Sequence, residues 1–274
     1  MTPVCVSAEA FFLPGLHGQL FCMFYPAQTP SVRGNCFYVH PFAEELNKTR
    51  RMAALYSSML ALAGFNVLQL DLYGCGDSEG DWRNIRQDTW RSDIHCGVQW
   101  LQKQCDQPLM MWGLRLGASL AVEYLTAYPG TDATLLLWQP VIKGENHLNQ
   151  FLRLRLAAQI QQQSKDTVAL LRSQLRQGEI LEIAGYAVTS ELLALMDAME
   201  INQLPVGVKQ VYWAEVVATS ALELTLPSKK VISQWRAEPI QIQAQVVVGQ
   251  SFWATQEIAV AESLIDMSLQ WLAQ

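Results

Sequence analysis

The hydrophobic positions of the chain predict a sheet of short buried strands connected by amphipathic helices. The chain opens with a predicted hairpin, Ala10–Leu13 and Gln19–Tyr25. Further apolar runs predict strands at Cys36–Val39, Phe65–Leu72, Pro108–Trp112 and Ala133–Trp138. Helical periodicity separates these runs: one helix ends before Gly64, and others cover about 87–104 and 116–128. Alternation of this kind is typical of right-handed βαβ units and a mainly parallel sheet.

The alternation stops between residues 144 and 204. This segment, which includes the Gln-rich stretch 159–163, has a largely helical pattern without a clear buried strand. The core pattern then resumes with a strand at Gln210–Val217, a short helix near Ser228–Trp235, a strand at Ile240–Val248 and a helix over about 256–272. We therefore predict one domain over residues 1–274 that carries a helical cap insertion at 144–204.

Composition narrows the class of protein. Half of the 274 residues are hydrophobic and 16% are charged, which is typical of a globular chain with a large core. The net charge of −6 disfavours a nucleic-acid partner, which requires clustered Lys and Arg. We expect neither a secretory signal nor a membrane span. The six cysteines form no CxxC pair and are expected to be reduced thiols in a cytoplasmic protein. The histidines show no metal-site spacing, so neither a metal nor a cofactor is expected.

The segment Gly113-Leu114-Arg115-Leu116-Gly117 identifies the fold. It joins an apolar strand to an Ala- and Leu-rich helix, where α/β hydrolases carry the Gly-x-Ser-x-Gly nucleophile elbow. We therefore predict an α/β-hydrolase fold with an eight-stranded, mostly parallel sheet, helices on both faces and a helical cap. Arg115 stands at the nucleophile position, and a guanidinium has no lone pair with which to attack a carbonyl.

The order of catalytic groups gives a second, independent test. In this fold the chain order is nucleophile, acid, histidine, and the histidine follows the last strand. The histidines here are His17, His40, His95 and His147, whereas the last predicted strand runs into Gly249–Trp253. Glu215 lies at the expected acid position but has no histidine to orient. The ordinary serine mechanism is therefore not expected.

Several side chains are predicted to surround the elbow and to form a ligand site. The backbone N–H groups of Phe42 and Leu116 are candidates for an oxyanion hole. Arg115 is expected to clamp an exogenous anion or to form an internal ion pair with Glu215, Glu44 or Glu45, and the two can coexist if donors remain free. The candidate ligand-binding residues are His40, Phe42, Glu44, Glu45, Arg115, Leu116, Glu215 and Trp253. For His40 the competing interpretation is a hydrogen bond that fixes its loop, and for Trp253 it is core filling.

Five segments resemble one family, the second type of exosortase A system-associated hydrolase. They are His40–Lys48, Asp71–Ser78, Trp112–Gly117, Leu137–Pro140 and Phe151–Arg155. The resemblance implies a serine aminopeptidase/lysophospholipase-like α/β hydrolase encoded beside bacterial exopolysaccharide and exosortase genes. It also implies that Gly-Leu-Arg-Leu-Gly belongs to the family itself.

Three functions remain open at this stage. The first is an inactive hydrolase that binds an anionic, acyl or sugar ligand. The second is an active ester or acyl hydrolase in which Glu44 or Glu215 activates water and Arg115 stabilises charge. The third is a structural or regulatory partner of the exosortase/exopolysaccharide machinery that uses the cap as its interface.

Overall fold

The computed structural model describes residues 6–86, 88–159 and 166–273. Its central sheet has eight strands in the order β1-β2-β4-β3-β5-β6-β9-β10. Their bounds are β1 Glu9–Pro14, β2 Gln19–Tyr25, β3 Gly34–Val39, β4 Phe65–Leu70, β5 Leu109–Leu114, β6 Ala133–Trp138, β9 Val208–Val217 and β10 Gln241–Val248. β2 pairs antiparallel with β1 and β4, and all other neighbours are parallel. The predicted eight-stranded, mostly parallel sheet is confirmed.

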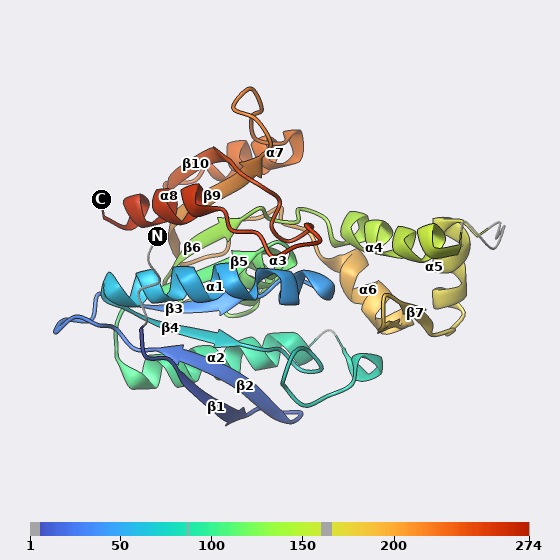
Figure 1. Cartoon of the computed structure of the whole chain (residues 1–274), viewed down its shortest axis with the longest axis horizontal. Helices are drawn as coiled ribbons and strands as arrows, with labels where there is room; N and C mark the ends of the chain where they lie inside the picture. Colours follow the sequence, from blue (N-terminus) through green and yellow to red (C-terminus); the bar gives the residue numbers. More distant parts are fainter. Residues whose placement is uncertain (1–5, 87, 160–165, 274) are drawn as a thin grey trace.

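Helices cover both faces of this sheet (Figure 1). They are α1 Glu44–Leu62, α2 Thr89–Gln104, α3 Leu116–Ala127, α7 Leu226–Trp235 and α8 Glu262–Leu272. Apolar side chains of α1 and α8 form one core with one face, and those of α2, α3 and α7 form a second core with the other. The last helix begins at Glu262, six residues later than its predicted start near Gln256.

The segment between β6 and β9 projects beyond the sheet on the right of Figure 1. It contains α4 Gly144–Gln159, α5 Val168–Arg176 and α6 Ser190–Ala198. It also contains an antiparallel hairpin of β7 Leu181–Ile183 and β8 Tyr186–Val188. The expectation of a segment without a buried strand was therefore wrong, because Leu181, Ile183 and Val188 are all buried. Much of the Gln-rich stretch 159–163 lies outside the described residues.

A buried arginine ties the three cap helices together. Arg172 on α5 donates to both carboxylate oxygens of Asp197 on α6, at 2.6 and 2.7 Å, and to Asn149 on α4 at 3.0 Å. Arg172 is 7% exposed, so these contacts compensate a charge that would otherwise be costly to bury.

In the turn between β5 and α3, the backbone at two glycines lies very close to neighbouring backbone atoms. A Cβ on Gly117 would lie 2.1 Å from the carbonyl oxygen of Val39 and 2.5 Å from that of His40. A Cβ on Gly113 would lie 2.4 Å from the Cα of Ala118. Only glycine allows the helix to start this close to β3 and β5.

Replacing Gly117 by alanine tests this constraint. Because the new methyl group meets fixed backbone, we expect Gly117→Ala to lower the free energy of unfolding by about 3 kcal/mol or more. Denaturant unfolding measures the change. Gly130→Ala is the control, since its Cβ would meet no atom of the described residues within 4 Å and its positive φ of 99° is what opposes the substitution. Equal, small losses in both variants would contradict the tight approach.

Candidate functional site

Arg115 occupies the apex of the turn between β5 and α3. Its φ of 57° and ψ of −120° place it in a backbone region that residues with a Cβ rarely adopt. Two hydrogen bonds hold it there: the Arg115 N–H donates to the Trp138 carbonyl at 2.9 Å, and the Val141 N–H donates to the Arg115 carbonyl at 3.2 Å. The turn therefore has the sharp, strained geometry that presents a side chain at the top of the sheet.

The guanidinium of Arg115 contacts an acidic and an aromatic side chain. Its Nε and Nη2 donate to Oε1 of Glu45 at 3.2 and 3.1 Å. Its Cζ also lies 5.2 Å from the ring centroid of Trp253, within cation–π range. The Arg115 and Glu45 side chains are only 16% and 13% exposed. Of the three internal partners considered for Arg115, the structure selects Glu45.

Glu45 reaches Arg115 from the first turn of α1, because the turn before that helix is also sharp. Ala43 adopts a φ of 51° and a ψ of −130°, nearly the backbone geometry of Arg115. Burial raises the pKa of Glu45 above its ordinary value, while the adjacent Arg115 lowers it. Two strained turns on the neighbouring strands β3 and β5 thus bring the carboxylate and the guanidinium together.

The predicted oxyanion region is closed. Phe42 and Leu116, whose N–H groups were its candidates, line a cavity of only about 10 Å³ together with His40. Such a space is too small to admit more than about one water molecule. The N–H of Leu116 lies in the first turn of α3, where a helix offers no backbone acceptor.

A second cavity lies beside the ion pair, between α1 and the cap. It measures about 140 Å³ and is lined by Phe42, Glu44, Glu45, His147, Gln150, Phe151 and Leu154. Four of these residues come from α4, and their spacing puts them on one face of that helix. The cap therefore forms one wall of this space, and the start of α1 forms the other.

The sequence analysis missed the four residues that α4 contributes to this cavity, of which His147 is the titratable one. His147 is 8% exposed, and its ring centroid lies 5.7 Å from that of Phe42. Burial and the positive charge of Arg115 lower the pKa of His147 to about 3, so the imidazole is neutral near pH 7. The helical spacing of His147, Gln150, Phe151 and Leu154 was a usable signal, because it aligns them on one face.

Two predicted site residues have other partners. Glu215 lies inside β9 and not after it, and its oxygens accept from the N–H of Thr225 at 2.8 Å and from the Thr225 hydroxyl at 3.2 Å. It therefore supports the start of α7. His40 accepts from the Leu72 N–H at 3.1 Å through Nε2, and its Nδ1 lies 2.7 Å from the Pro41 carbonyl. These contacts agree with a role in fixing the loop.

Trp253 follows β10 in the loop where this fold places its catalytic histidine. It is 6% exposed and is the tryptophan that contacts Arg115. Three other tryptophans, in β5, β6 and β9, fill the core with fully buried rings: Trp112, Trp138 and Trp213.

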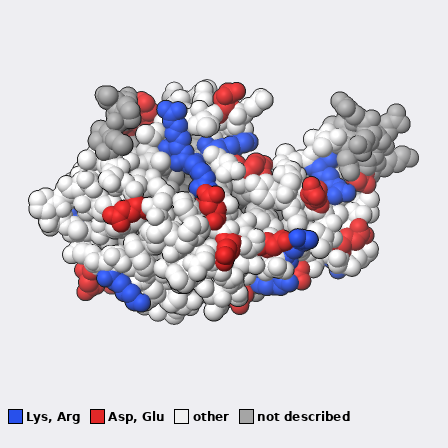
Figure 2. Space-filling view, turned by 60° about the horizontal axis from the view of Figure 1, so that its bottom comes forward, with Lys and Arg blue, Asp and Glu red and all other residues white. Residues whose placement is uncertain are grey.

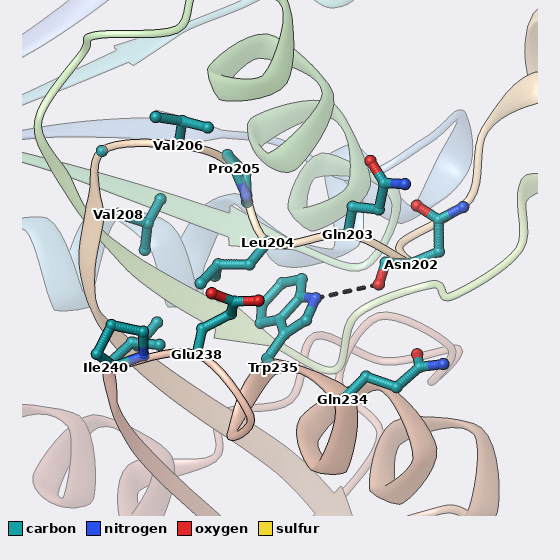
Figure 3. A pocket seen from close by; sticks show the side chains of 12 residues that line it. Asn202, Gln203, Leu204, Pro205, Val206, Val208, Gln234, Trp235, Glu238 and Ile240 are labelled. Atoms are coloured by element: carbon teal, nitrogen blue, oxygen red, sulfur yellow. Dashed lines mark hydrogen bonds between the residues drawn. The ribbon is translucent and has the colours of Figure 1, made fainter.

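A larger cavity of about 600 Å³ lies at the opposite edge of the sheet (Figure 3). It borders the beginnings of β9 and β10, and Trp235 donates there to the Asn202 carbonyl at 3.3 Å. Ligands of open α/β sheets bind at the carboxyl ends of the strands, where Arg115 lies. We therefore place the candidate site at the 140 Å³ cavity.

Three further features bear on the expected class of protein. On the face shown in Figure 2, basic side chains lie among acidic ones.

The described residues contain no group of three potential metal ligands and no helix long and apolar enough to cross a membrane. Of the cysteines, the five within the described ranges are free thiols, and Cys5 lies outside them.

Residues 30–185, more than half of the chain, match the family described as serine aminopeptidase, S33. The chain belongs to this family. Comparison with curated proteins gives no match. The family match covers the elbow, the start of α1 and the cap as far as the turn of its hairpin.

Solved structures of α/β hydrolases resemble this member of the family in fold. A thermostable carboxyl esterase from Bacillus coagulans is 15% identical, with 98% and 99% of the two chains covered and a TM-score of 0.65. A soluble variant of monoglyceride lipase from Saccharomyces cerevisiae is 15% identical, with 98% and 97% covered and a TM-score of 0.66. Est1E from Butyrivibrio proteoclasticus is 14% identical, with 97% and 100% covered and a TM-score of 0.62. At these identities the likeness establishes the α/β-hydrolase fold alone.

A double-mutant cycle tests the ion pair at the elbow. We expect Arg115→Met and Glu45→Gln each to destabilise the protein, because each leaves a largely buried charge without its partner. The double variant should recover part of the loss, giving a coupling energy of about 1–3 kcal/mol in denaturant unfolding. Simple additivity of the two losses would contradict the contact.

The pH dependence of stability tests the environment of His147. Its pKa falls from an ordinary value of 6.5 to about 3 in the folded state, so the unfolded state binds more protons between these values. Stability is then lost as the pH falls from about 6.5 toward 3, by up to about 1.4 kcal/mol per pH unit. The free energy of unfolding is measured for the wild type and for His147→Gln at pH 4.5–7.5, and the difference is plotted against pH. Because both proteins contain His40, its contribution cancels in this difference. A flat difference curve would exclude this account.

Proposed function

We propose that this protein is a ligand-binding member of its family that does not perform serine-based acyl transfer. One observation carries the proposal: the guanidinium of Arg115 stands at the elbow, where it is held between Glu45 and Trp253. A nucleophile must expose a reactive lone pair to a base, and neither Arg115 nor Trp253 offers one. The elbow then serves to position a charge, and the pocket beneath the cap holds a small molecule.

The sizes of the two cavities near Arg115 indicate where a ligand would bind. The oxyanion region measures about 10 Å³, whereas the space between α1 and α4 measures about 140 Å³. Phe42 and Phe151, with ring centroids 5.2 Å apart, give that space an apolar wall. Small-molecule sites combine such walls with a few polar groups. Glu44, Glu45, His147 and Gln150 are the polar residues here.

The setting of this function is proposed from the resemblance of the elbow and of the four other segments. We propose that the protein acts in the cytoplasm of a bacterium, alongside exosortase and exopolysaccharide machinery. The anionic ligand that Arg115 first suggested receives little support, since Glu45 already compensates its charge.

Activity-based labelling tests the proposal. A serine-directed fluorophosphonate probe should leave the protein unlabelled, and ester and thioester panels should show no turnover above a heat-inactivated sample. Arg115→Ser should not restore turnover, because Trp253 stands in the loop after the last strand. The Bacillus coagulans carboxyl esterase is a suitable positive control for probe and panel.

One result would overturn the exclusion of serine chemistry, and a second would replace the ligand-binding role by catalysis. Labelling of the wild type would show a reactive serine. Turnover that is lost in Glu44→Gln but retained in Glu182→Gln, a change on the exposed side of β7, would instead establish hydrolysis by water with Glu44 as base.

A further inference from the structure

The strand β10 forms one edge of the central sheet. The strand order ends in β9-β10, and within the described residues β10 pairs with β9 alone, in a continuous parallel register from Gln241 to Val248. It lies at one end of the sheet, and β1 lies at the other (Figure 1). A strand of 8 residues is about 27 Å long, so its outer side presents a row of backbone N–H and C=O groups.

One hydrogen bond identifies the residues of β10 whose backbone groups point outward. The N–H of Gly249, directly after the strand, donates to the Val217 carbonyl of β9 at 3.0 Å. Backbone N–H and C=O groups alternate in direction along a strand, so the odd-numbered residues of β10 direct theirs toward β9. The N–H and C=O groups of Ile242, Ala244 and Val246 therefore point away from the sheet.

The sequence of β10 lacks the features that usually prevent two sheet edges from pairing. Residues 241–248 contain no charged residue and no proline, and their register with β9 is free of bulges. At the other edge of the sheet, β1 begins with Glu9 and ends with Pro14. Proteins protect sheet edges with charges, prolines and bulges. Of the two edges, β10 is therefore the one suited to pair with another strand.

A second copy of β10 matches this edge. Two identical edges meet antiparallel about a two-fold axis perpendicular to the sheet. With that axis at Ala244, Ile242 lies opposite Val246 of the second copy, and Gln243 lies opposite Gln245 of the second copy. Apolar side chains then meet on one face and amides meet on the other, with no like charges opposed. The outward backbone groups exchange about six hydrogen bonds in this register.

We propose that β10 is a dimer interface, at which a second copy of this chain pairs antiparallel and continues the sheet across the two-fold axis. Ile242 and Ala244 are partly buried against the core that α7 covers, and the added strand covers them further. A dimer of this kind uses both β10 edges and leaves a β1 strand at each end. Assembly therefore stops at two copies.

Sedimentation velocity of the whole protein tests the dimer. At about 10–100 µM the wild type should sediment with twice the chain mass of 30.8 kDa, and dilution should return it to the monomer. Amide hydrogen exchange then tests the location. The N–H groups of Ile242, Ala244 and Val246 should exchange at least tenfold more slowly in the dimer than in the diluted monomer, because pairing removes them from water.

Two variants of β10 test the same interface. Gln245→Lys puts a charge at an exposed position near the two-fold axis, so the two copies repel and dimer affinity should fall about fivefold. Ala244→Pro removes an N–H that points away from β9, and it should weaken the dimer at least tenfold. Gln104→Lys makes the same charge change at an exposed position of α2 and should leave the affinity unchanged. Melting temperatures verify that each variant is folded.

Each opposite result overturns this interface. A wild type that stays monomeric up to about 100 µM would show that two β10 edges do not pair. A dimer that Gln245→Lys leaves intact, or in which the three outward amides exchange rapidly, would use another surface. Assemblies larger than two copies would indicate pairing of β10 with β1, a contact that does not close.

Discussion

The buried positive charge of Arg115 is the constraint on which the arrangement of this site depends. A guanidinium that is 16% exposed requires a partner, and the partner comes from the first turn of α1. That contact joins the start of α1 to the start of α3, and Phe42, just before α1, packs against Phe151 of the cap. Trp253 completes the enclosure from the loop after β10, with its ring 5.2 Å from the guanidinium. Residues from three distant parts of the chain thus meet around one charge.

The same charge sets the electrostatics of the neighbouring cavity. Burial and then Arg115 lower the pKa of His147, and Arg115 opposes the rise that burial causes in the pKa of Glu45. The imidazole is consequently neutral, and one oxygen of Glu45 accepts from Arg115 while the other has no hydrogen-bond partner among the described residues. Glu44 adds a negative charge that Arg115 does not bond. An arginine at the elbow therefore acts on the pKa values of two residues that line the neighbouring cavity.

Sequence patterns predicted the sheet, its helices and the position of the elbow, because these follow from local periodicity and from the glycines around Arg115. They left three candidate partners for Arg115, since the choice depends on how α1 is rotated and on where Glu215 points from β9. The β7–β8 hairpin was missed because strands of three residues carry almost no alternation. His147 was missed because its role depends on the docking of the cap against Phe42, a contact across more than a hundred residues.

The strained backbone conformation at the elbow determines the direction in which the Arg115 side chain leaves the turn. A residue with a Cβ at a φ of 57° costs about 1–3 kcal/mol, and here Trp138 and Val141 hold that conformation through hydrogen bonds. In a serine hydrolase this strained turn presents the nucleophile. In this protein the same turn directs a long, permanently charged side chain to Glu45 and Trp253. Because both contacts depend on that backbone geometry, the turn holds the guanidinium against one oxygen of Glu45 and the ring of Trp253.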